Sequence, residues 1–226
     1  MISIVMPTLN EERALPETLE SIETQQGPIE VIVADGGSED ATVEIVRSFS
    51  MTGHRVRCVQ APRGRARQMN AGAAVAGGEW LLFLHADTRL PIDAATRIAG
   101  LPAEVQAGCF HQLFNTRSRF LRALSWAHNQ RFRVTRVVYG DQAMFVRRGL
   151  FDEVGGFPDR PMEDVAISLM LRARTRPEML PGVVLTDARK FEQMGPWRAL
   201  RHSVALLLRF RRGADVSGDP FFDDYR

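Results

Sequence analysis

The first half of the chain alternates between short apolar runs and segments whose apolar residues recur at helical spacing. Runs of β-branched and large apolar side chains predict strands at residues 2–6, 31–33, 57–60 and 80–84. Helical spacing predicts helices between them, at residues 11–24, 41–49 and 67–76. Strands that alternate with helices in this way indicate right-handed crossovers and a mostly parallel sheet.

The second half of the chain has a less regular pattern. It predicts strands at residues 105–114, 143–146 and 183–185, and helices at residues 120–132, 163–174 and 197–211. No internal repeat, low-complexity tract or linker interrupts it. We therefore expect a single α/β domain over residues 1–226, with a Rossmann-like, mostly parallel mixed sheet flanked by helices.

Three polar loops follow predicted strands, at residues 7–11, 35–40 and 85–88. In open α/β sheets, ligands bind beyond the carboxyl ends of the strands. These loops are therefore expected to meet at one edge of the sheet, where they would form a binding site.

The composition is that of an ordinary globular chain, with 226 residues, 45% hydrophobic and 25% charged. The net charge of +2 is too small to indicate binding of a nucleic acid, so none is expected as a partner. Cys58 and Cys109 form no CxxC pair, which is typical of a reducing cytosol. No basic segment precedes the apolar residues 2–5, and no apolar run approaches the ~20 residues that span a bilayer. A cytoplasmic protein is expected.

Several common chemistries lack their motifs. The dinucleotide fingerprint GxGxxG and the zinc-binding HExxH do not occur, and Lys190, the only lysine, lies outside any P-loop pattern. The GxSxG elbow fails because the segment that begins at Gly36 ends in Asp40. These absences weigh against a dehydrogenase, a P-loop NTPase, a zinc protease or a serine hydrolase.

Two of the loops have both a structural and a functional interpretation. Residues 7–12 offer Asn10 as an N-cap for the next helix. Asp35 ends a strand and precedes two glycines. It would either form a tight turn or accept hydrogen bonds from the base or ribose of a nucleotide, which glycine lets approach the backbone.

The other candidate residues also have both a structural and a functional interpretation. His85 and Asp87 suit a divalent cation presented to a diphosphate, but a structural histidine and a capping aspartate give the same pattern. Residues 139–142 would offer polar groups to a hydroxylated substrate or form a turn. Asp164 begins a helix, where it is either a favourable cap or a general base for an acceptor hydroxyl.

Taken in order, these segments resemble one family. From Ser3-Ile4-Val5-Met6-Pro7-Thr8-Leu9-Asn10-Glu11 to about Gly182, the chain resembles a family-2 glycosyltransferase with the GT-A fold. It is particularly similar to a compact bacterial subgroup. The segments that carry this similarity are residues 64–72, 84–88, 139–142, 155–158 and 162–164.

The resemblance implies a role for each matching position. The donor nucleotide would be contacted by Pro7, Thr8, Asn10, Glu11, Asp35 and one or both of Arg65 and Arg67. Asp87 corresponds to the last acid of the metal-binding DxD motif, and Asp164 to the catalytic base of the ED motif. Residues 1–100 would form the nucleotide-sugar-binding half and residues 101–195 the acceptor and catalytic half.

The sequence departs from the family pattern at His85, where the family usually has aspartate. Losing a carboxylate lowers the negative charge of the site, and an imidazole tolerates Mn²⁺ better than Mg²⁺. Alternatively, His85 contacts only the ribose of the nucleotide. We expect Mn²⁺ or Mg²⁺ as the cofactor, bound by Asp87.

The resemblance implies transfer of a sugar, with inversion, from a nucleoside diphosphate sugar (a UDP-sugar first) to an acceptor hydroxyl. A nucleotidyltransferase of similar fold is an alternative, although residues 7–12 contain no glycine and offer acids to a triphosphate. An inactive nucleotide-sugar-binding module is another, and its support is the substitution at His85. The pattern selects neither an acceptor nor an oligomeric state.

Residues 196–226 are expected to form an amphipathic helix and a tail. The apolar face comprises Trp197, Leu200, Val204, Leu207 and Leu208, and the positive charges are Arg198, Arg201, Arg209, Arg211 and Arg212. Such a helix either lies on an anionic bilayer, here the inner face of the cell membrane, or packs its apolar face onto the domain.

Overall fold

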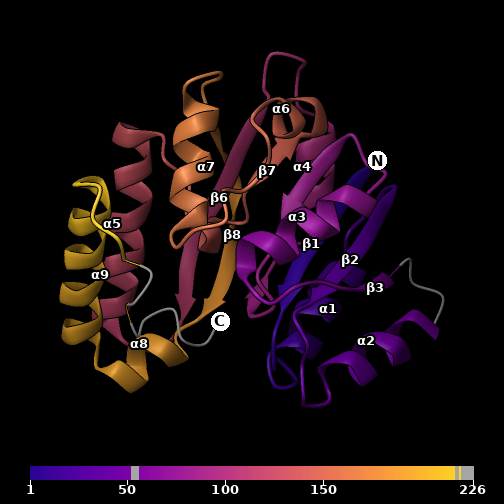
Figure 1. Ribbon diagram of the computed structural model, residues 1–226, viewed down its shortest axis with the longest axis horizontal. Coiled ribbons are helices and arrows are strands. Elements are labelled where there is room, and N and C mark those ends of the chain that lie inside the picture. The colour runs from indigo at the N-terminus through magenta and orange to yellow at the C-terminus, as the bar shows by residue number, and fades with distance from the viewer. Residues whose placement is uncertain (52–55, 217–218, 220–226) are drawn as a thin grey trace.

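The strands form one mixed sheet. The computed structural model describes residues 1–51, 56–216 and 219 (Figure 1). Its eight-stranded sheet has the order β3-β2-β1-β4-β7-β6-β8-β5. The strands are β1 (Ile2–Thr8), β2 (Ile29–Asp35), β3 (Val56–Gln60), β4 (Trp80–Phe83), β5 (Thr88–Arg89), β6 (Ala107–Asn115), β7 (Phe145–Arg147) and β8 (Glu178–Asp187).

Nine α-helices and a 3₁₀ turn lie in the described part of the chain. They are α1 (Leu15–Glu23), α2 (Thr42–Met51), α3 (Arg65–Val75), α4 (Ala94–Ala99), α5 (Arg119–Thr135), η1 (Gly140–Gln142), α6 (Arg148–Glu153), α7 (Glu163–Arg172), α8 (Arg189–Met194) and α9 (Pro196–Arg211). The predicted alternation of strands and helices in the first half is confirmed.

The sheet is mostly parallel, as the sequence predicts. Four pairings are parallel, β1 with β2 and β4, β2 with β3, and β6 with β8. The other three, β4 with β7, β6 with β7 and β5 with β8, are antiparallel. In the first half, the carboxyl ends of β1, β2 and β4 therefore point to one edge.

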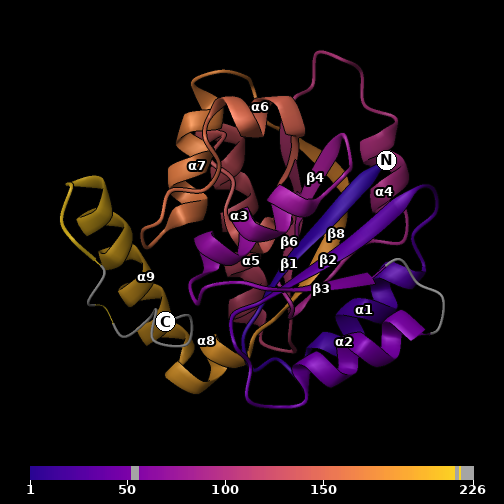
Figure 2. The ribbon, with the colours of Figure 1, turned by 45° about the vertical axis from the view of Figure 1, so that its right-hand side comes forward.

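Helices cover both faces of the sheet because side chains alternate along each strand. Ile4, Met6 and Val33 face the core beneath α1, α2 and α4, and Val5 and Ile32 face the core beneath α3, α6 and α7. Figure 2 shows the strands between α1 and α2 on one side and α3, α6 and α7 on the other. Both faces are buried, which explains the nearly continuous apolar runs of the first half.

The boundaries of the predicted strands in the first half differ from the observed ones by no more than two residues. The predicted start of the first helix at residue 11 is wrong, because α1 begins at Leu15. Asn10 is not its N-cap, since Ala14 occupies that position and Asn10 has a left-handed φ of 54°. β5, α6 and α8 were not expected, because elements this short show no periodicity.

The amphipathic helix near the C-terminus is present as α9, which lies at the periphery of the molecule (Figures 1 and 2). It buries Ala199 and Leu206, whereas Trp197, Val204 and Leu208 of the predicted apolar face are exposed. Much of the expected tail, residues 217–218 and 220–226, lies outside the described residues. In the described part of the chain, every helix is too short or too polar to cross a bilayer.

Candidate active site

Three loops meet at the carboxyl edge of β1, β2 and β4, as the sequence predicts. Thr8 and Asp35 are register partners at the ends of β1 and β2, and Thr8 Oγ1 donates a hydrogen bond of 3.2 Å to Asp35 Oδ1. The third loop, after β4, is anchored to α1, because Thr18 Oγ1 donates a hydrogen bond of 2.7 Å to the carbonyl of Ala86.

The first two loops are tied to each other by reciprocal hydrogen bonds. The backbone N–H of Asn10 donates to Ser38 Oγ at 2.9 Å, and Asn10 Oδ1 accepts from the N–H of Glu39 at 2.8 Å. Glu12 and Asp40 repeat this exchange, since Glu12 N–H donates to Asp40 and Glu12 Oε2 accepts from Ala41 N–H. These bonds hold residues 10–12 out of the helix, which is the physical reason for the late start of α1.

A polar cleft opens where the loops meet, and we call it the edge cleft. It is lined by Pro7, Thr8, Leu9, Glu11, Arg65, Gln68, His85, Ala86 and Asp87. Six of the residues predicted to bind nucleotide or metal are thus brought together. Asn10, Asp35 and Arg67, which were also predicted to bind nucleotide, do not line it.

Asp35 is buried and bonded within its own loop. Its carboxylate accepts from the N–H groups of Gly37 and Ser38, each at 2.9 Å, and from the hydroxyl of Ser38. The residue thereby shapes the turn after β2, which is the structural one of the two interpretations, and its contact with a nucleotide stays a prediction.

Arg65 and Arg67, which the sequence could not separate, occupy different places. Arg65 lines the edge cleft, and its Nη1 lies 3.4 Å from Oε1 of the buried Glu163 at the start of α7. Arg67 pairs with Asp159 at 2.8 Å, and both side chains are more than half exposed. Arg65 is therefore the arginine placed to contact a ligand in the cleft.

The carboxylates of the edge cleft are held near a second arginine. Arg189, at the start of α8, donates from Nη2 to Oε2 of Glu11 at 2.6 Å. Burial raises the pKa of Glu11, and Arg189 opposes that rise. Burial likewise raises the pKa of Asp87, against the nearby Arg189 and Arg65. The two arginines thus partly balance the negative charge of the cleft.

His85 is a neutral imidazole at physiological pH. Burial, together with the positive charge of Arg65, lowers the pKa of its ring from 6.5 to about 3. A neutral imidazole nitrogen is available as a metal ligand or a hydrogen-bonding group.

Asp164 stands beside the cleft at the first turn of α7. Its Oδ2 accepts a hydrogen bond of 2.7 Å from the N–H of Gly140 in η1. A Cβ at Gly140 would lie 2.6 Å from Nε2 of His85 and 3.4 Å from Oδ2 of Asp164. Glycine therefore allows His85, from the loop after β4, and Asp164, from α7, to approach the same backbone.

Two polar residues were not predicted, Gln68 in the lining of the cleft and Arg189 beside it. Gln68 donates from Nε2 to the carbonyls of Thr8 at 2.6 Å and Ala34 at 3.0 Å, which ties α3 to the ends of β1 and β2. Its place within the similar segment 64–72 was a usable signal. Arg189 lies 178 residues from Glu11 and outside every similar segment, so no local pattern indicated it.

The donor atoms of His85 and Asp87 fit a divalent cation that a ligand completes. Among the residues that the structure describes, no three His, Cys, Asp or Glu side chains gather where they could hold a metal ion. One carboxylate and one neutral imidazole suit Mn²⁺, whose other ligands would then be phosphate oxygens and water. Arg65 in the cleft and Arg189 beside it offer positive charge to an anionic ligand, and Asp164 lies close by.

Comparison with known proteins agrees with this geometry. The model of glycosyl transferase family 2 matches residues 3–155. A PGL/p-HBAD biosynthesis glycosyltransferase of Mycobacterium bovis is 33% identical over 170 residues, which are 70% of this chain and 63% of the relative. The chain thus spans less than two thirds of the length of that relative. Glycosyltransferase GlyG of Streptococcus pneumoniae is 37% identical over 91 residues, which are 38% of this chain and 30% of that protein.

Solved structures share the fold. A crystal structure of S. aureus TarS in complex with UDP-GlcNAc has a TM-score of 0.67 and 21% identity, over 82% of this chain and 58% of that chain. The mannosyltransferase PcManGT from Pyrobaculum calidifontis, in complex with GDP-Man and Mn²⁺, has a TM-score of 0.62 and 25% identity, over 81% of this chain and 56% of that one. These likenesses confirm the GT-A fold expected from the sequence.

Proposed function

The chain belongs to glycosyl transferase family 2, and from that premise we propose that it transfers a sugar, with inversion, from a nucleoside diphosphate sugar to an acceptor hydroxyl. The observation that carries the proposal is the edge cleft, where Glu11, Arg65 and Asp87 surround a polar space beside Asp164. Membership of the family and the similarity to a named glycosyltransferase support this activity.

The donor would lie in the edge cleft. TarS with UDP-GlcNAc and PcManGT with GDP-Man support a nucleotide sugar, and we propose a UDP-sugar first. The residues assigned to the nucleotide are Pro7, Thr8, Asn10, Glu11, Asp35, Arg65, Arg67 and His85. Of these, Asn10 and Asp35 would act largely through the shape of their loops, since their side chains are bonded there. Arg67 would have to leave Asp159 to reach the donor.

The chemical step needs one base and no nucleophile from the enzyme. Asp164 would accept the proton of the acceptor hydroxyl, whose oxygen attacks the anomeric carbon opposite the diphosphate. The bond from that carbon to the diphosphate oxygen breaks, and the nucleoside diphosphate leaves with its electron pair. Arg65 would stabilise the negative charge of the leaving group from within the cleft. The hydrogen bond from Gly140 fixes the carboxylate of Asp164 for this role.

A divalent cation would be held by Asp87, with His85 as its second protein ligand. Mn²⁺ or Mg²⁺ would supply Lewis-acid neutralisation of the diphosphate, and the Mn²⁺ of the PcManGT complex supports Mn²⁺. Within a single domain, residues 1–100 would bind the donor, and residues 101–195 would bind the acceptor and supply the base.

Release of nucleotide from UDP-, GDP- and TDP-sugars, with and without Mn²⁺, tests the proposal. We expect metal-dependent release from one of the three and an inverted anomeric configuration in the product, measured by NMR. Pyrophosphate release from UTP and a sugar phosphate would instead favour a nucleotidyltransferase. Nucleotide binding by calorimetry without any turnover would favour an inactive binding module.

We propose that α9 brings the enzyme to an anionic membrane surface, the inner face of the cell membrane. The exposed fractions of Trp197, Val204 and Leu208 are 68%, 48% and 47%. α9 contains arginines and no acidic residue, so its charge complements anionic lipids.

Co-sedimentation with vesicles tests this contact. Vesicles with anionic lipid should pellet the protein, vesicles of neutral lipid should not, and Trp197→Ser should reduce pelleting. Ile92→Ser is the matched control, because Ile92 is 70% exposed and lies outside α9. Equal pelleting of both variants and the unaltered protein would contradict a role for α9.

A further inference from the structure

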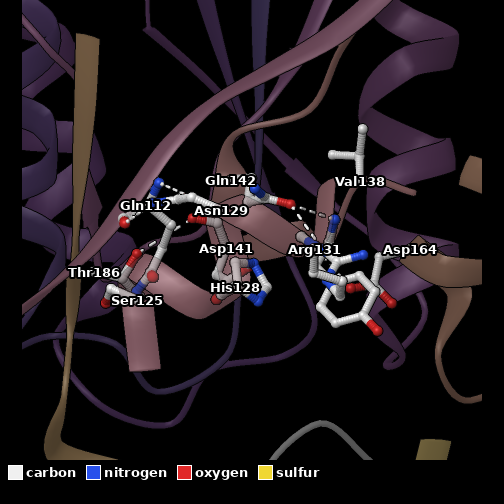
Figure 3. Close-up of polar contacts among 12 residues, drawn as sticks. Gln112, Ser125, His128, Asn129, Arg131, Val138, Asp141, Gln142, Asp164 and Thr186 are labelled. Atoms are coloured by element: carbon white, nitrogen blue, oxygen red, sulfur yellow. Dashed lines mark hydrogen bonds and ion pairs between the residues drawn. The ribbon is translucent and has the colours of Figure 1, made fainter. Parts of the chain in front are cut away.

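A cluster of buried polar groups next to Asp164 lacks the partners that such groups normally have. Gln112 of β6 is 1% exposed and Gln142 of η1 is fully buried. Among the described residues, both side-chain atoms of the Gln112 amide, Nε2 of Gln142, Nε2 of His128 and Oδ1 of Asp141 make no hydrogen bond. We call these four residues the Asp141 cluster (Figure 3).

Such a concentration is unusual, because most buried polar atoms in native proteins are hydrogen-bonded. Leaving one donor or acceptor unpaired costs about 1–3 kcal/mol. Several unpaired atoms in one place therefore indicate that something else, water or a ligand, supplies the missing bonds.

The Asp141 cluster adjoins the reacting centre of the proposed enzyme. Asp141 follows Gly140, whose N–H donates to Oδ2 of Asp164 at 2.7 Å. A Cβ at Gly140 would touch the ring of His85, which lines the edge cleft. A molecule in contact with Asp141 would thus lie close to both the base and the donor.

The side chains of His128 and Asp141 are 15% and 26% exposed, so part of each faces solvent. Nε2 of His128 and Oδ1 of Asp141 are themselves buried and form an ion pair at 3.3 Å without the alignment of a hydrogen bond. Burial works against ionisation of Asp141, but His128, His85 and Arg131 together lower the pKa of Asp141 below its usual value. An ionised carboxylate accepts hydrogen bonds, and the hydroxyl groups of an acceptor can supply them.

The frame around this pair is rigid. The guanidinium of Arg131 lies 3.7 Å from the centre of the Tyr139 ring and donates to the carbonyl of Val137 at 2.8 Å. On the other side, Asn129 exchanges two hydrogen bonds, of 3.0 and 2.8 Å, with the backbone of Gln112. These contacts anchor the part of α5 that carries His128 to β6 and to the segment before η1.

We propose that Asp141 and His128 form an acceptor subsite for hydroxyl groups, which makes the acceptor a sugar or another polyol. The proposal rests on the proposed function, since it places this subsite beside the base Asp164. One hydroxyl of the acceptor loses its proton to Asp164, and a neighbouring hydroxyl donates a hydrogen bond to Asp141. His128 is a positioning residue that holds Asp141.

Kinetics separate the subsite from the rest of the enzyme. Glycerol and methyl α-glucoside serve as probe acceptors, with hydrolysis of the active nucleotide sugar as the second readout. Asp141→Asn should raise KM for the probe acceptors about 10- to 100-fold, because hydrogen bonds to charged groups contribute that much. Hydrolysis of the donor by water should change less than about twofold. Asp152→Asn, on the exposed surface of α6, is the matched control and should change neither.

Equal losses of transfer and hydrolysis in Asp141→Asn would overturn the subsite, because Asp141 would then act on the donor or the base. No change in either would overturn it as well. A loss of transfer alone, in a protein that still hydrolyses the donor, supports it.

Histidine-ring NMR supplies a readout that does not need catalysis. Methyl α-glucoside should shift the ring resonances of His128, identified from His128→Gln, and leave those of His202 unchanged. The same addition to Asp141→Asn should give a much smaller shift. A polyol-dependent shift without nucleotide turnover would leave the subsite standing and refute the proposed transfer. Absence of any shift, together with unchanged KM in Asp141→Asn, would refute the subsite.

Discussion

The edge cleft and the Asp141 cluster adjoin at Gly140, but they differ in how their buried polar groups are paired. In the edge cleft each charge has a compensating neighbour, such as Arg189 for Glu11 and Arg65 for Glu163. In the Asp141 cluster, both side-chain atoms of the Gln112 amide and Nε2 of Gln142 have no hydrogen bond within the described part of the chain. His128 and Asp141 compensate each other only as an ion pair at 3.3 Å that lacks the alignment of a hydrogen bond.

Under the proposed function, this difference matches what each region would recognise. A nucleoside diphosphate sugar carries charge, and a cleft whose carboxylates are already balanced by arginines does not repel it. A hydroxylated acceptor carries none, so its recognition depends on hydrogen bonds that the protein leaves open. The proposed donor side is thus prepared for its ligand by balanced charges. The proposed acceptor side is prepared by hydrogen-bonding groups that the protein leaves unused.

The largest effect is expected where the two regions meet, at Asp164. Asp164→Asn keeps an oxygen for the Gly140 N–H but loses the base, so turnover should fall about 10²- to 10⁴-fold. Donor affinity, measured by calorimetry with UDP and Mn²⁺, should change less than about twofold. A parallel loss of affinity and turnover would show that Asp164 serves the edge cleft rather than the acceptor. Asp152→Asn is the control for a surface aspartate.

A substitution at Gly140 should disturb both regions through sterics alone. The Cβ of Gly140→Ala would lie 2.6 Å from Nε2 of His85, so His85 and the backbone bonded to Asp164 must move apart. Misplacement by about 1 Å costs on the order of 100-fold in rate, and we expect that loss in single-turnover transfer.

Gly149→Ala in α6 is the matched control, because a Cβ there meets nothing within 4 Å. Full turnover in Gly140→Ala would show that catalysis does not need the close approach of His85 and Asp164.

The donor side was largely predictable from the sequence because its information is local. Apolar runs placed β1, β2 and β4, parallel connections brought their carboxyl ends to one edge, and the loops after them carried Glu11 and Asp87. The start of α1 was mispredicted because bonds between Asn10 and residues 38–39 override the local helical pattern.

The acceptor side was less predictable because its partners are distant in the sequence. Gln112 and His128 come from β6 and α5, and neither residue has a local motif. An unpaired hydrogen-bonding atom leaves no trace in periodicity, since it is defined by neighbours that are missing. Arg189 was missed for a related reason, because only the folded chain brings α8 to the loop after β1.

Stability measurements sharpen the comparison between a carboxylate with several hydrogen bonds and one whose ion pair with His128 is poorly aligned. Glu30 is buried in the donor half and accepts hydrogen bonds from Ser3 at 2.6 Å, Gly77 at 2.6 Å and Arg57 at 2.7 Å. Glu30→Gln should lower the free energy of unfolding at pH 7 by about 1–3 kcal/mol. Asp141→Asn, whose Oδ1 lacks a hydrogen bond, should cost clearly less in urea unfolding.

The effect of Glu30→Gln should depend on pH. Burial opposes ionisation of Glu30, but the hydrogen bonds from Ser3 and Gly77 and the charge of Arg57 lower its pKa overall. Because the pKa of Glu30 is lower in the folded state, the ionised side chain stabilises the protein at pH values above the unfolded pKa of about 4.3. This stabilisation is lost as the pH falls through the pKa of the folded state. The difference between Glu30→Gln and the unaltered protein should therefore shrink below about pH 4. A difference that grew in acid would contradict this account.

The smallest effect is expected at Arg189, which tests the balanced charge of the edge cleft directly. Arg189→Gln leaves Glu11 and Asp87 with less positive charge beside them, so the cleft repels a diphosphate more strongly. Because the arginine is partly exposed, UDP affinity should weaken only about 5- to 10-fold, and less at high salt. Arg174→Gln is the control, since Arg174 pairs with Glu153 and both side chains are more than half exposed. Tighter UDP binding by Arg189→Gln would mean that the Glu11–Arg189 pair occludes the cleft, and the contrast between a balanced donor side and an open acceptor side would fail.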